Sequence, residues 1–250
     1  MKEFNAKRIP NSSRYSIDEL CDPESSLVNA IPTQAQFEKF VSEELGIGAT
    51  DHVVIYQRGG SIGGARAWWT FRLMGHNRVS FLDGGLEAWT KAGGPVLHHP
   101  EGKEEDLPVA SSKPLKTDFK AVMNKTMLAS LKDVERIMES GSAQILDARS
   151  SPRFRVEEGH IPGSLNIPYT SIMRADDPMS FRPPNEIRDA FVDAGLILGS
   201  RTVLSCGSGV TACILALGLQ IIGKDITKGH AVYNGSWSEW SLSNNKKAKC

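Results

Sequence analysis

The chain has no surplus of either charge. Its 250 residues include 29 lysines and arginines and 29 aspartates and glutamates, so the formal net charge is zero. This balance argues against nucleic acid or an anionic membrane as the main partner, because both are bound through basic surfaces. No stretch approaches the ~20 consecutive apolar residues of a membrane span. We therefore expect a globular protein that binds neither partner.

Cysteine is also scarce. The four cysteines, at positions 21, 206, 213 and 250, are too few for a disulfide framework in a chain of this length. None of them forms a CxxC redox motif or lies at zinc-ligand spacing from a histidine, so we expect no metal and no cofactor. The first residues lack the apolar core of a secretory signal and the arginine-rich pattern of a mitochondrial presequence. We expect a reducing compartment, the cytosol, with the mitochondrion as the alternative.

The most informative segment surrounds Cys206. A β-like run, 202–205, leads straight into this cysteine, and an apolar run at near-helical spacing, 210–222, follows it. The pattern predicts a strand, a tight loop and a helix, with the thiol at the turn. Backbone N–H groups of such a loop favour an anion, and so favour a thiolate over a thiol. Gly207 and Gly209 permit conformations and close approaches that a plain core strand does not need. Cys206 is therefore predicted to be a nucleophile rather than an inert core residue.

The same loop lacks basic residues. A cysteine phosphatase closes its loop with an arginine six residues after the cysteine, where this chain has Ala212. No lysine or arginine occurs from Cys206 to Ile222. A phosphate dianion would therefore lack its counter-charge. Backbone dipoles and one hydroxyl suit a smaller anionic group, such as a cysteine persulfide.

Three short blocks of sequence recur in the same order, about 150 residues apart. Repeated blocks at a nearly constant spacing indicate a duplicated domain. The matched pairs are 8–11 with 160–163, 52–57 with 201–206, and 82–89 with 233–240.

Each copy alternates short apolar strands with amphipathic helices, which predicts an α/β fold with a parallel sheet flanked by helices. In the second copy we expect a helix over 128–138, a strand over 144–147 and a helix over 185–194. The division into domains is expected to be a first domain over 1–93, a linker over 94–124, a second domain over 125–243 and a polar tail over 244–250.

The two copies differ in two ways. Gln57 stands where the second copy has Cys206, so the first copy cannot perform thiol chemistry. The first copy also has only seven residues before Arg8, and its first strand and helix are expected to be missing. Such a shortened domain would expose an unpaired strand edge. Three explanations stay open: a shortened isoform, a degenerate family member, or a chain that completes itself as a homodimer.

With these blocks, the sequence resembles the tandem rhodanese-domain sulfurtransferases, from about Arg8 to Trp240. The loop 206–212 is similar to the active-site loop of the branch that uses 3-mercaptopyruvate. The thiosulfate-cleaving branch typically has arginine and lysine after the cysteine, and both are absent here. Segments 159–163 and 147–149 are also similar to the family's pattern. The resemblance implies two tandem rhodanese-like domains, the second of them catalytic.

The resemblance also implies a two-step reaction. Cys206 would take a sulfur atom from a small-molecule donor, and the persulfide would pass it to a thiol acceptor, such as thioredoxin or glutathione, or to cyanide. The amides of the loop would stabilise the persulfide anion, with the Ser208 and Thr211 hydroxyls adding donors. For Thr211, N-capping of the following helix is an equal alternative. Ser208 is thus expected to be catalytic, and the substrate-binding residues of the loop are expected to be Gly207, Gly209, Val210 and Thr211.

Three further residues match positions of the family's site. Arg153 matches an arginine that binds the substrate's carboxylate, although a solvated loop arginine is the alternative. The family's second such arginine lies in a segment that this chain lacks, and Arg155 is the candidate substitute. Asp18 matches the aspartate of a relay that ends at the loop serine. At the relay's histidine position the chain has Asn29, which can hydrogen-bond but cannot carry a proton at neutral pH.

Three functions remain open at this point. The first is a sulfurtransferase that prefers 3-mercaptopyruvate. The second is an enzyme that takes thiosulfate instead or as well, although a doubly charged donor should bind weakly in a loop without cations. The third is a weakly catalytic sulfur carrier or binding protein, which the shortened first copy and Asn29 favour.

Overall fold

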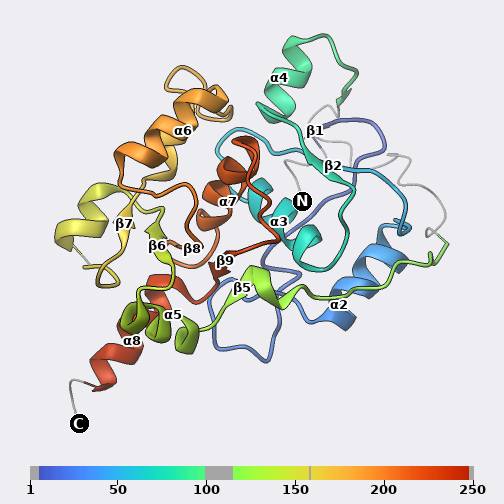
Figure 1. Cartoon of the computed structure of the whole chain (residues 1–250). Coiled ribbons are helices and arrows are strands. Elements are labelled where there is room, and N and C mark those ends of the chain that lie inside the picture. The colour runs from blue at the N-terminus through green and yellow to red at the C-terminus, as the bar shows by residue number, and fades with distance from the viewer. Residues whose placement is uncertain (1–5, 99–114, 158, 248–250) are drawn as a thin grey trace.

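The computed structural model describes residues 6–98, 115–157 and 159–247 (Figure 1). Most of the predicted linker, and the last three residues of the predicted polar tail, lie outside these ranges. None of the helices in the described ranges is both long enough and apolar enough to cross a membrane.

The second domain is built on a five-stranded parallel sheet with the strand order β5-β9-β8-β6-β7. All four residues of the central strand β8 are buried. Because parallel strands end at a common edge, the residues that follow β6 and β8 meet there. The strands are β5 (Leu128–Ala129), β6 (Gln144–Asp147), β7 (Leu165–Asn166), β8 (Thr202–Ser205) and β9 (His230–Tyr233).

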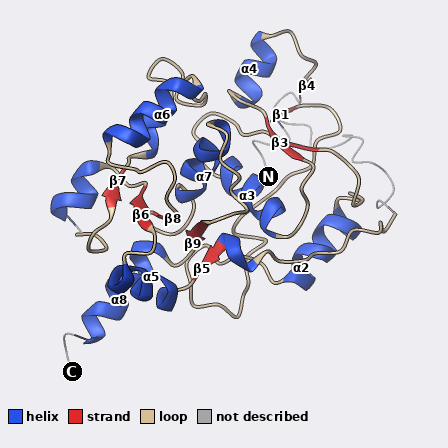
Figure 2. Cartoon of the chain, viewed as in Figure 1, coloured by secondary structure: helices blue, strands red, loops and turns tan. Residues whose placement is uncertain are grey.

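Helices cover both faces of this sheet (Figure 2). Alternate side chains of a strand point to opposite faces. Ile145 and Val203 accordingly pack in one hydrophobic cluster with residues of α5 and α8, whereas Leu146 and Leu204 pack in the main cluster with residues of α6 and α7. The helical elements are η2 (Lys125–Met127), α5 (Leu131–Ser140), η3 (Arg153–Glu157), η4 (Tyr169–Ile172), α6 (Pro184–Asp193), α7 (Ala212–Ile221) and α8 (Ser236–Lys247).

The predicted helix over 128–138 begins later than expected. Leu128 and Ala129 form strand β5, and α5 starts only at Leu131. The Ser130 side chain accepts a hydrogen bond from the Asp133 backbone N–H, and the Asp133 side chain accepts one from the Ser130 N–H. This capping box sets the helix start, and the strand pairing of Leu128 with Val232 outweighs the helical spacing.

The first domain repeats this plan in reduced form, as predicted. Among the described residues of this domain, β2 and β3 form a two-stranded parallel sheet, and β1 pairs with β4 in a separate antiparallel ribbon that the repeat did not predict. The Val54 side chain in β2 is 53 % exposed, whereas its counterpart strand β8 is buried throughout. The elements are β1 (Lys7–Arg8), α2 (Gln34–Lys39), η1 (Phe40–Glu44), β2 (Val53–Ile55), α3 (Gly64–Leu73), β3 (Val79–Phe81), α4 (Gly85–Lys91) and β4 (Leu97–His98).

The two domains share one hydrophobic core. Helices α3 and α7 pack against each other, and both occupy the middle of the molecule (Figure 1). Trp68 and Trp69 of α3 belong to the same buried cluster as Cys213 and Leu217 of α7. Cys206 belongs to this cluster as well. The cysteine loop is therefore supported by both domains.

Candidate active site

Cys206 follows the last residue of β8, at the carboxyl edge of the second sheet, and its side chain is buried. The Gly209 backbone N–H donates a hydrogen bond to Cys206 Sγ over 3.1 Å. The Cys206 backbone N–H donates to Ser236 Oγ over 3.1 Å, and this hydroxyl lies 4.0 Å from the sulfur. A donor fixed on the sulfur stabilises negative charge there without reorganisation when the charge forms.

Glycine stands at two positions of the loop, 207 and 209, for different physical reasons. Gly209 has φ +78°, and a β carbon on it would lie 2.7 Å from the Asn234 carbonyl oxygen. Any other residue would therefore be both strained and in collision. A β carbon on Gly207 would meet only Arg153 Nη2, at 3.7 Å. Gly207 thus marks the place where the Arg153 guanidinium approaches the loop.

The start of α8 holds the loop from the other side. The backbone N–H groups of Trp237 and Ser238 donate to the carbonyls of Cys206 and Gly207, each over 3.0 Å. Ser238 Oγ also donates to the Gly207 carbonyl, over 2.6 Å. Sequence reasoning used the segment 233–240 only as evidence for the repeat, and so missed Ser236 and Ser238 as supports of the loop.

In the first domain, the loop at Gln57 is held by the same kind of hydrogen bond from a following helix, although it has no thiol. The Leu86 N–H donates to the Gln57 carbonyl over 2.9 Å, as Trp237 does to Cys206. Gln57 Oε1 accepts a hydrogen bond from the Gly64 N–H, where α3 begins. An amide oxygen thus occupies the helix start in the first copy, where the second copy places its sulfur.

Arg66 of the first domain reaches the cysteine loop. Its side chain is 1 % exposed, and its guanidinium lies 5.2 Å from the Trp69 ring centroid. Nη1 donates to the Gly209 carbonyl over 3.0 Å, and Nη2 donates to the Asn29 carbonyl over 2.9 Å. Sequence reasoning missed this residue, because an arginine within a helix is ordinarily solvated. The loop without basic residues therefore has a positive charge behind its backbone.

The structure brings Asn29 and Ser208 together. Asn29 Nδ2 donates a hydrogen bond to Ser208 Oγ over 2.8 Å, across the domain boundary. Asn29 has φ 53°, a left-handed conformation that asparagine tolerates. Asp18 is exposed, and its backbone carbonyl accepts a hydrogen bond from Cys21 Sγ. In the described ranges the Asp18 carboxylate makes no hydrogen bond to Asn29 or Ser208, and its catalytic role stays a prediction.

Arg153 begins η3, after the carboxyl end of β6, and its side chain is exposed. Its neighbour Phe154 is buried and stacks on His160 with ring centroids 4.0 Å apart, which fixes the segment. Arg155 is exposed too. Carboxylate binding by Arg153 stays a prediction that its position beside Gly207 supports.

Thr211 stands at the N-cap position of α7, but its side chain makes no capping hydrogen bond, so the capping alternative is wrong. The Val210 carbonyl accepts a hydrogen bond from the Cys213 N–H and so belongs to the first turn of α7. The roles of both residues in substrate binding stay predictions.

A buried ion pair braces the segments on which the site rests. Arg149 and Asp147 are each about 1 % exposed in their side chains, and Arg149 Nη2 lies 2.7 Å from Asp147 Oδ2. Arg149 also donates to the Gly159 carbonyl over 2.8 Å, and its guanidinium lies 4.8 Å from the Trp237 ring centroid. The pair therefore connects β6, the segment 159–163 and the start of α8.

Cys213 is the second thiol of this region. Its Sγ donates to the Gly209 carbonyl over 3.4 Å. Burial raises the pKa of Cys213 to about 12, against a smaller opposing effect of the Arg66 charge. This thiol stays protonated at neutral pH. No cluster of three or more metal-ligating side chains occurs in the ranges that the structure describes.

Comparison with known proteins agrees with this geometry. The rhodanese-like domain family matches residues 1–92 and 130–243. The chain belongs to the rhodanese family. It is 34% identical to human 3-mercaptopyruvate sulfurtransferase over 96% of this chain and 79% of that protein. It is also 34% identical to rat thiosulfate sulfurtransferase, with the same coverage.

Two solved structures superpose on most of the chain. SseA from Escherichia coli, a 3-mercaptopyruvate sulfotransferase by its description, matches with a TM-score of 0.78 and 30% identity over 94% of this chain and 85% of that one. Tum1 from Saccharomyces cerevisiae matches with a TM-score of 0.79 and 25% identity over 97% of this chain and 83% of that one. The duplicated α/β domain predicted from the repeat, and the rhodanese fold implied by the family resemblance, are confirmed.

Proposed function

We propose that this rhodanese-family enzyme transfers a sulfur atom from 3-mercaptopyruvate to a thiol or to cyanide through a persulfide on Cys206. The observation that carries the proposal is the loop itself. The Gly209 N–H donates to a buried sulfur, no basic side chain belongs to the loop, and Arg153 stands beside Gly207. Such a site favours a donor with a single carboxylate.

In the first step the Cys206 thiolate attacks the sulfur of 3-mercaptopyruvate. A sulfur–sulfur bond forms, the carbon–sulfur bond of the donor breaks, and its electron pair leaves as the enolate of pyruvate, which takes up a proton. Arg153 would pair with the donor's carboxylate. Because Asn29 donates to Ser208 Oγ, the hydroxyl proton of Ser208 can point toward the developing enolate oxygen.

In the second step an acceptor thiolate attacks the outer sulfur of the persulfide. The sulfur–sulfur bond of the persulfide breaks, and its electron pair returns to Cys206 Sγ. The Gly209 N–H hydrogen bond stabilises this leaving thiolate. A small thiol such as glutathione, or an exposed thiol of a thioredoxin, has the required chemistry.

Thiosulfate is the second candidate donor. The chain is as similar in sequence to rat thiosulfate sulfurtransferase as to human 3-mercaptopyruvate sulfurtransferase, and this supports thiosulfate as an alternative donor. The chemistry of the loop favours 3-mercaptopyruvate, because thiosulfate is a dianion and needs more positive charge than Arg153 supplies. Arg66 directs its guanidinium at two carbonyl oxygens and stands behind the loop.

The test compares pyruvate release from 3-mercaptopyruvate by the wild type and by Cys206→Ser. Cys213→Ser is the matched control, since this thiol is buried and protonated. Release should vanish only in the first variant, and equal release by the wild type and Cys206→Ser would end the proposal.

Faster thiocyanate formation from thiosulfate at equal donor concentration would favour the second donor. Intact mass should show a transient gain of about 32 Da, one sulfur atom, on Cys206. A stable adduct with slow turnover would instead indicate a sulfur carrier.

A further inference from the structure

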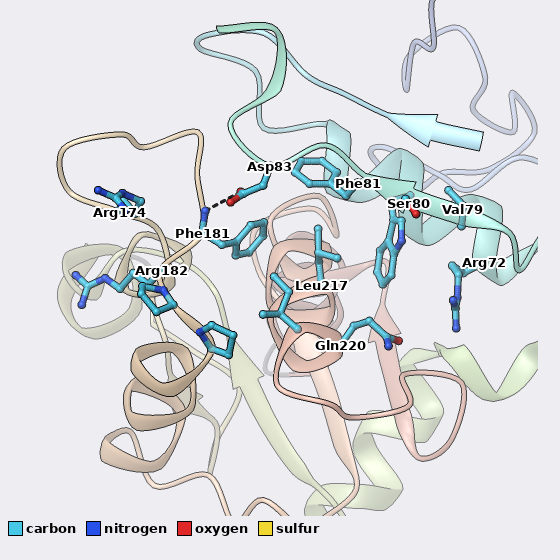
Figure 3. Close-up of a pocket in the computed structure, with 14 residues that line it drawn as sticks. Arg72, Val79, Ser80, Phe81, Asp83, Arg174, Phe181, Arg182, Leu217 and Gln220 are labelled. Carbon is cyan, nitrogen blue, oxygen red and sulfur yellow. Dashed lines mark hydrogen bonds between the residues drawn. The ribbon is translucent and has the colours of Figure 1, made fainter. Parts of the chain in front are cut away.

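A pocket of about 600 Å³ lies between the two domains, on α3 and β3 of the first and on α7 and the segment 174–184 of the second (Figure 3). Its volume is in the range of small-molecule sites. Neither Cys206 nor Arg153 lines it. The pocket borders the carboxyl end of α7, whereas the cysteine loop precedes the amino end of this helix.

The walls of this interdomain pocket are largely apolar and are supported across the boundary. Phe81 and Phe181 meet edge to face, with ring centroids 6.1 Å apart. Asp83 Oδ1 accepts a hydrogen bond from the Phe181 N–H over 2.9 Å, the dashed line in Figure 3. The pocket is therefore formed by contacts already in place. Its other apolar lining residues are Trp68, Val79, Pro183, Pro184, Leu217 and Ile221.

Arg72 is the unusual polar residue of this pocket. Its guanidinium lies 5.8 Å from the Trp68 ring centroid, and burial lowers its pKa. The Nε atom is buried without a hydrogen-bond partner, and attraction by the Asp225 charge opposes the effect of burial on the Arg72 pKa only in part. On the facing helix α7, Gln220 Oε1 is buried and likewise unpartnered. These two atoms have almost no accessible surface, so a ligand in the pocket would meet the outer atoms of the two side chains, the Arg72 Nη nitrogens and Gln220 Nε2, which lie on the same side of the pocket.

The remaining charges make the pocket positive. Arg174 is held by Asp176, with Nη2–Oδ2 at 2.8 Å, and Arg182 Nε donates to the Met173 carbonyl. Figure 3 shows both arginines on the side of the pocket opposite Arg72. Asp83 is the single acidic residue among the described residues that line the pocket.

We propose that this interdomain pocket binds a small aromatic anion. The ring system would occupy the apolar walls, a carboxylate or sulfonate would pair with the Arg72 guanidinium, and Gln220 Nε2 would donate to the same anionic group. The site is separate from the sulfur-transfer site and does not depend on the proposed reaction.

The test uses 8-anilinonaphthalene-1-sulfonate, an aromatic anion with an N–H group, in a fluorescence titration of the whole protein. N-phenyl-1-naphthylamine is the matched probe, because it keeps the rings and the N–H and lacks the sulfonate. The wild type should bind one molecule of the sulfonate, at least about tenfold more tightly than the uncharged probe. Arg72→Met should erase this difference. Arg188→Met, on the exposed face of α6, should keep it.

Two further measurements keep the test decisive. Cys206→Ser should bind the sulfonate as the wild type does, and loss of binding in this variant would assign the probe to the sulfur-transfer site. Saturating probe should raise the melting temperature of the wild type, which binding to unfolded chain would not do. If Arg72→Met does not fold, Gln220→Leu replaces it and should weaken binding of the sulfonate while binding of the uncharged probe stays the same. Absence of saturable binding, or equal preference in the wild type and Arg72→Met, would overturn the proposal.

Discussion

Arg66 in the first domain donates a hydrogen bond from Nη1 to the carbonyl of Gly209 in the second domain, over 3.0 Å. The same guanidinium holds the Asn29 carbonyl, and the Asn29 side chain in turn donates to Ser208. The copy that has no cysteine in its own loop thus positions the loop of the copy that has one. This relationship gives the first domain a physical role in a reaction it cannot perform.

Replacing Arg66 by glutamine should weaken both the fold and the site. Two hydrogen bonds from a buried charge are lost, and the free energy of unfolding should fall by about 2 kcal/mol or more. Urea unfolding measures this loss. Alkylation of Cys206 at neutral pH should also slow, because the loop is less ordered. Arg201→Gln, an exposed arginine, is the control. Unchanged stability and alkylation in Arg66→Gln would contradict this role.

Asn29→His should raise the rate of sulfur transfer from 3-mercaptopyruvate. Asparagine donates to Ser208 but carries no proton, whereas histidine supplies general acid–base catalysis that contributes about 10²-fold or more. Histidine also tolerates the left-handed backbone of this position. The variant should gain a pH dependence of kcat/KM near the ordinary histidine pKa of about 6.5. Asn29→Ala should be slower than the wild type. A histidine variant without gain would mean that proton transfer is not limiting.

Arg153→Gln should raise KM for 3-mercaptopyruvate about tenfold, because the ion pair with the donor's carboxylate is lost. The rate of Cys206 alkylation by uncharged iodoacetamide should not change, since Arg153 lies beside the loop without belonging to it. Steady-state kinetics with both reagents separate these effects. Arg155→Gln, on the same η3 segment, should have the smaller effect on KM. The reverse order of the two variants would assign the substrate's carboxylate to Arg155.

Cys213 should make the fold sensitive to alkaline pH. Its pKa is raised from 9.0 to about 12 in the folded protein, so the folded state holds the thiol proton more tightly than the unfolded chain does. This contribution is fully present below pH 9 and is lost as the pH rises toward 12. The slope is at most about 1.4 kcal/mol per pH unit. Cys213→Ser lacks this titration, so the difference in unfolding free energy between wild type and variant should change over this interval. A constant difference would exclude Cys213 as the source.

The cysteine loop and the repeat could be predicted because their signals are local. A strand, two glycines and an apolar helix are contiguous in the sequence, and 202–205 and 212–221 form the predicted elements. Arg66 and Ser236 could not be found in this way, because they lie 140 and 30 positions from Cys206 and reach the loop only through the fold. Only the start of the helix predicted over 128–138 was wrong, and for the same reason, since the pairing of Leu128 with β9 depends on residues about 100 positions away.

The strands of the two sheets also differ in how many neighbours they pair with. Within the described ranges β2 and β3 pair only with each other, whereas β8 has a neighbour on either side. The backbone amides on the outer edges of β2 and β3 are therefore less protected from solvent. Their hydrogens should exchange with deuterium well before those of β8. If the first domain unfolds locally before the second, the reactive cysteine lies in the domain that unfolds last.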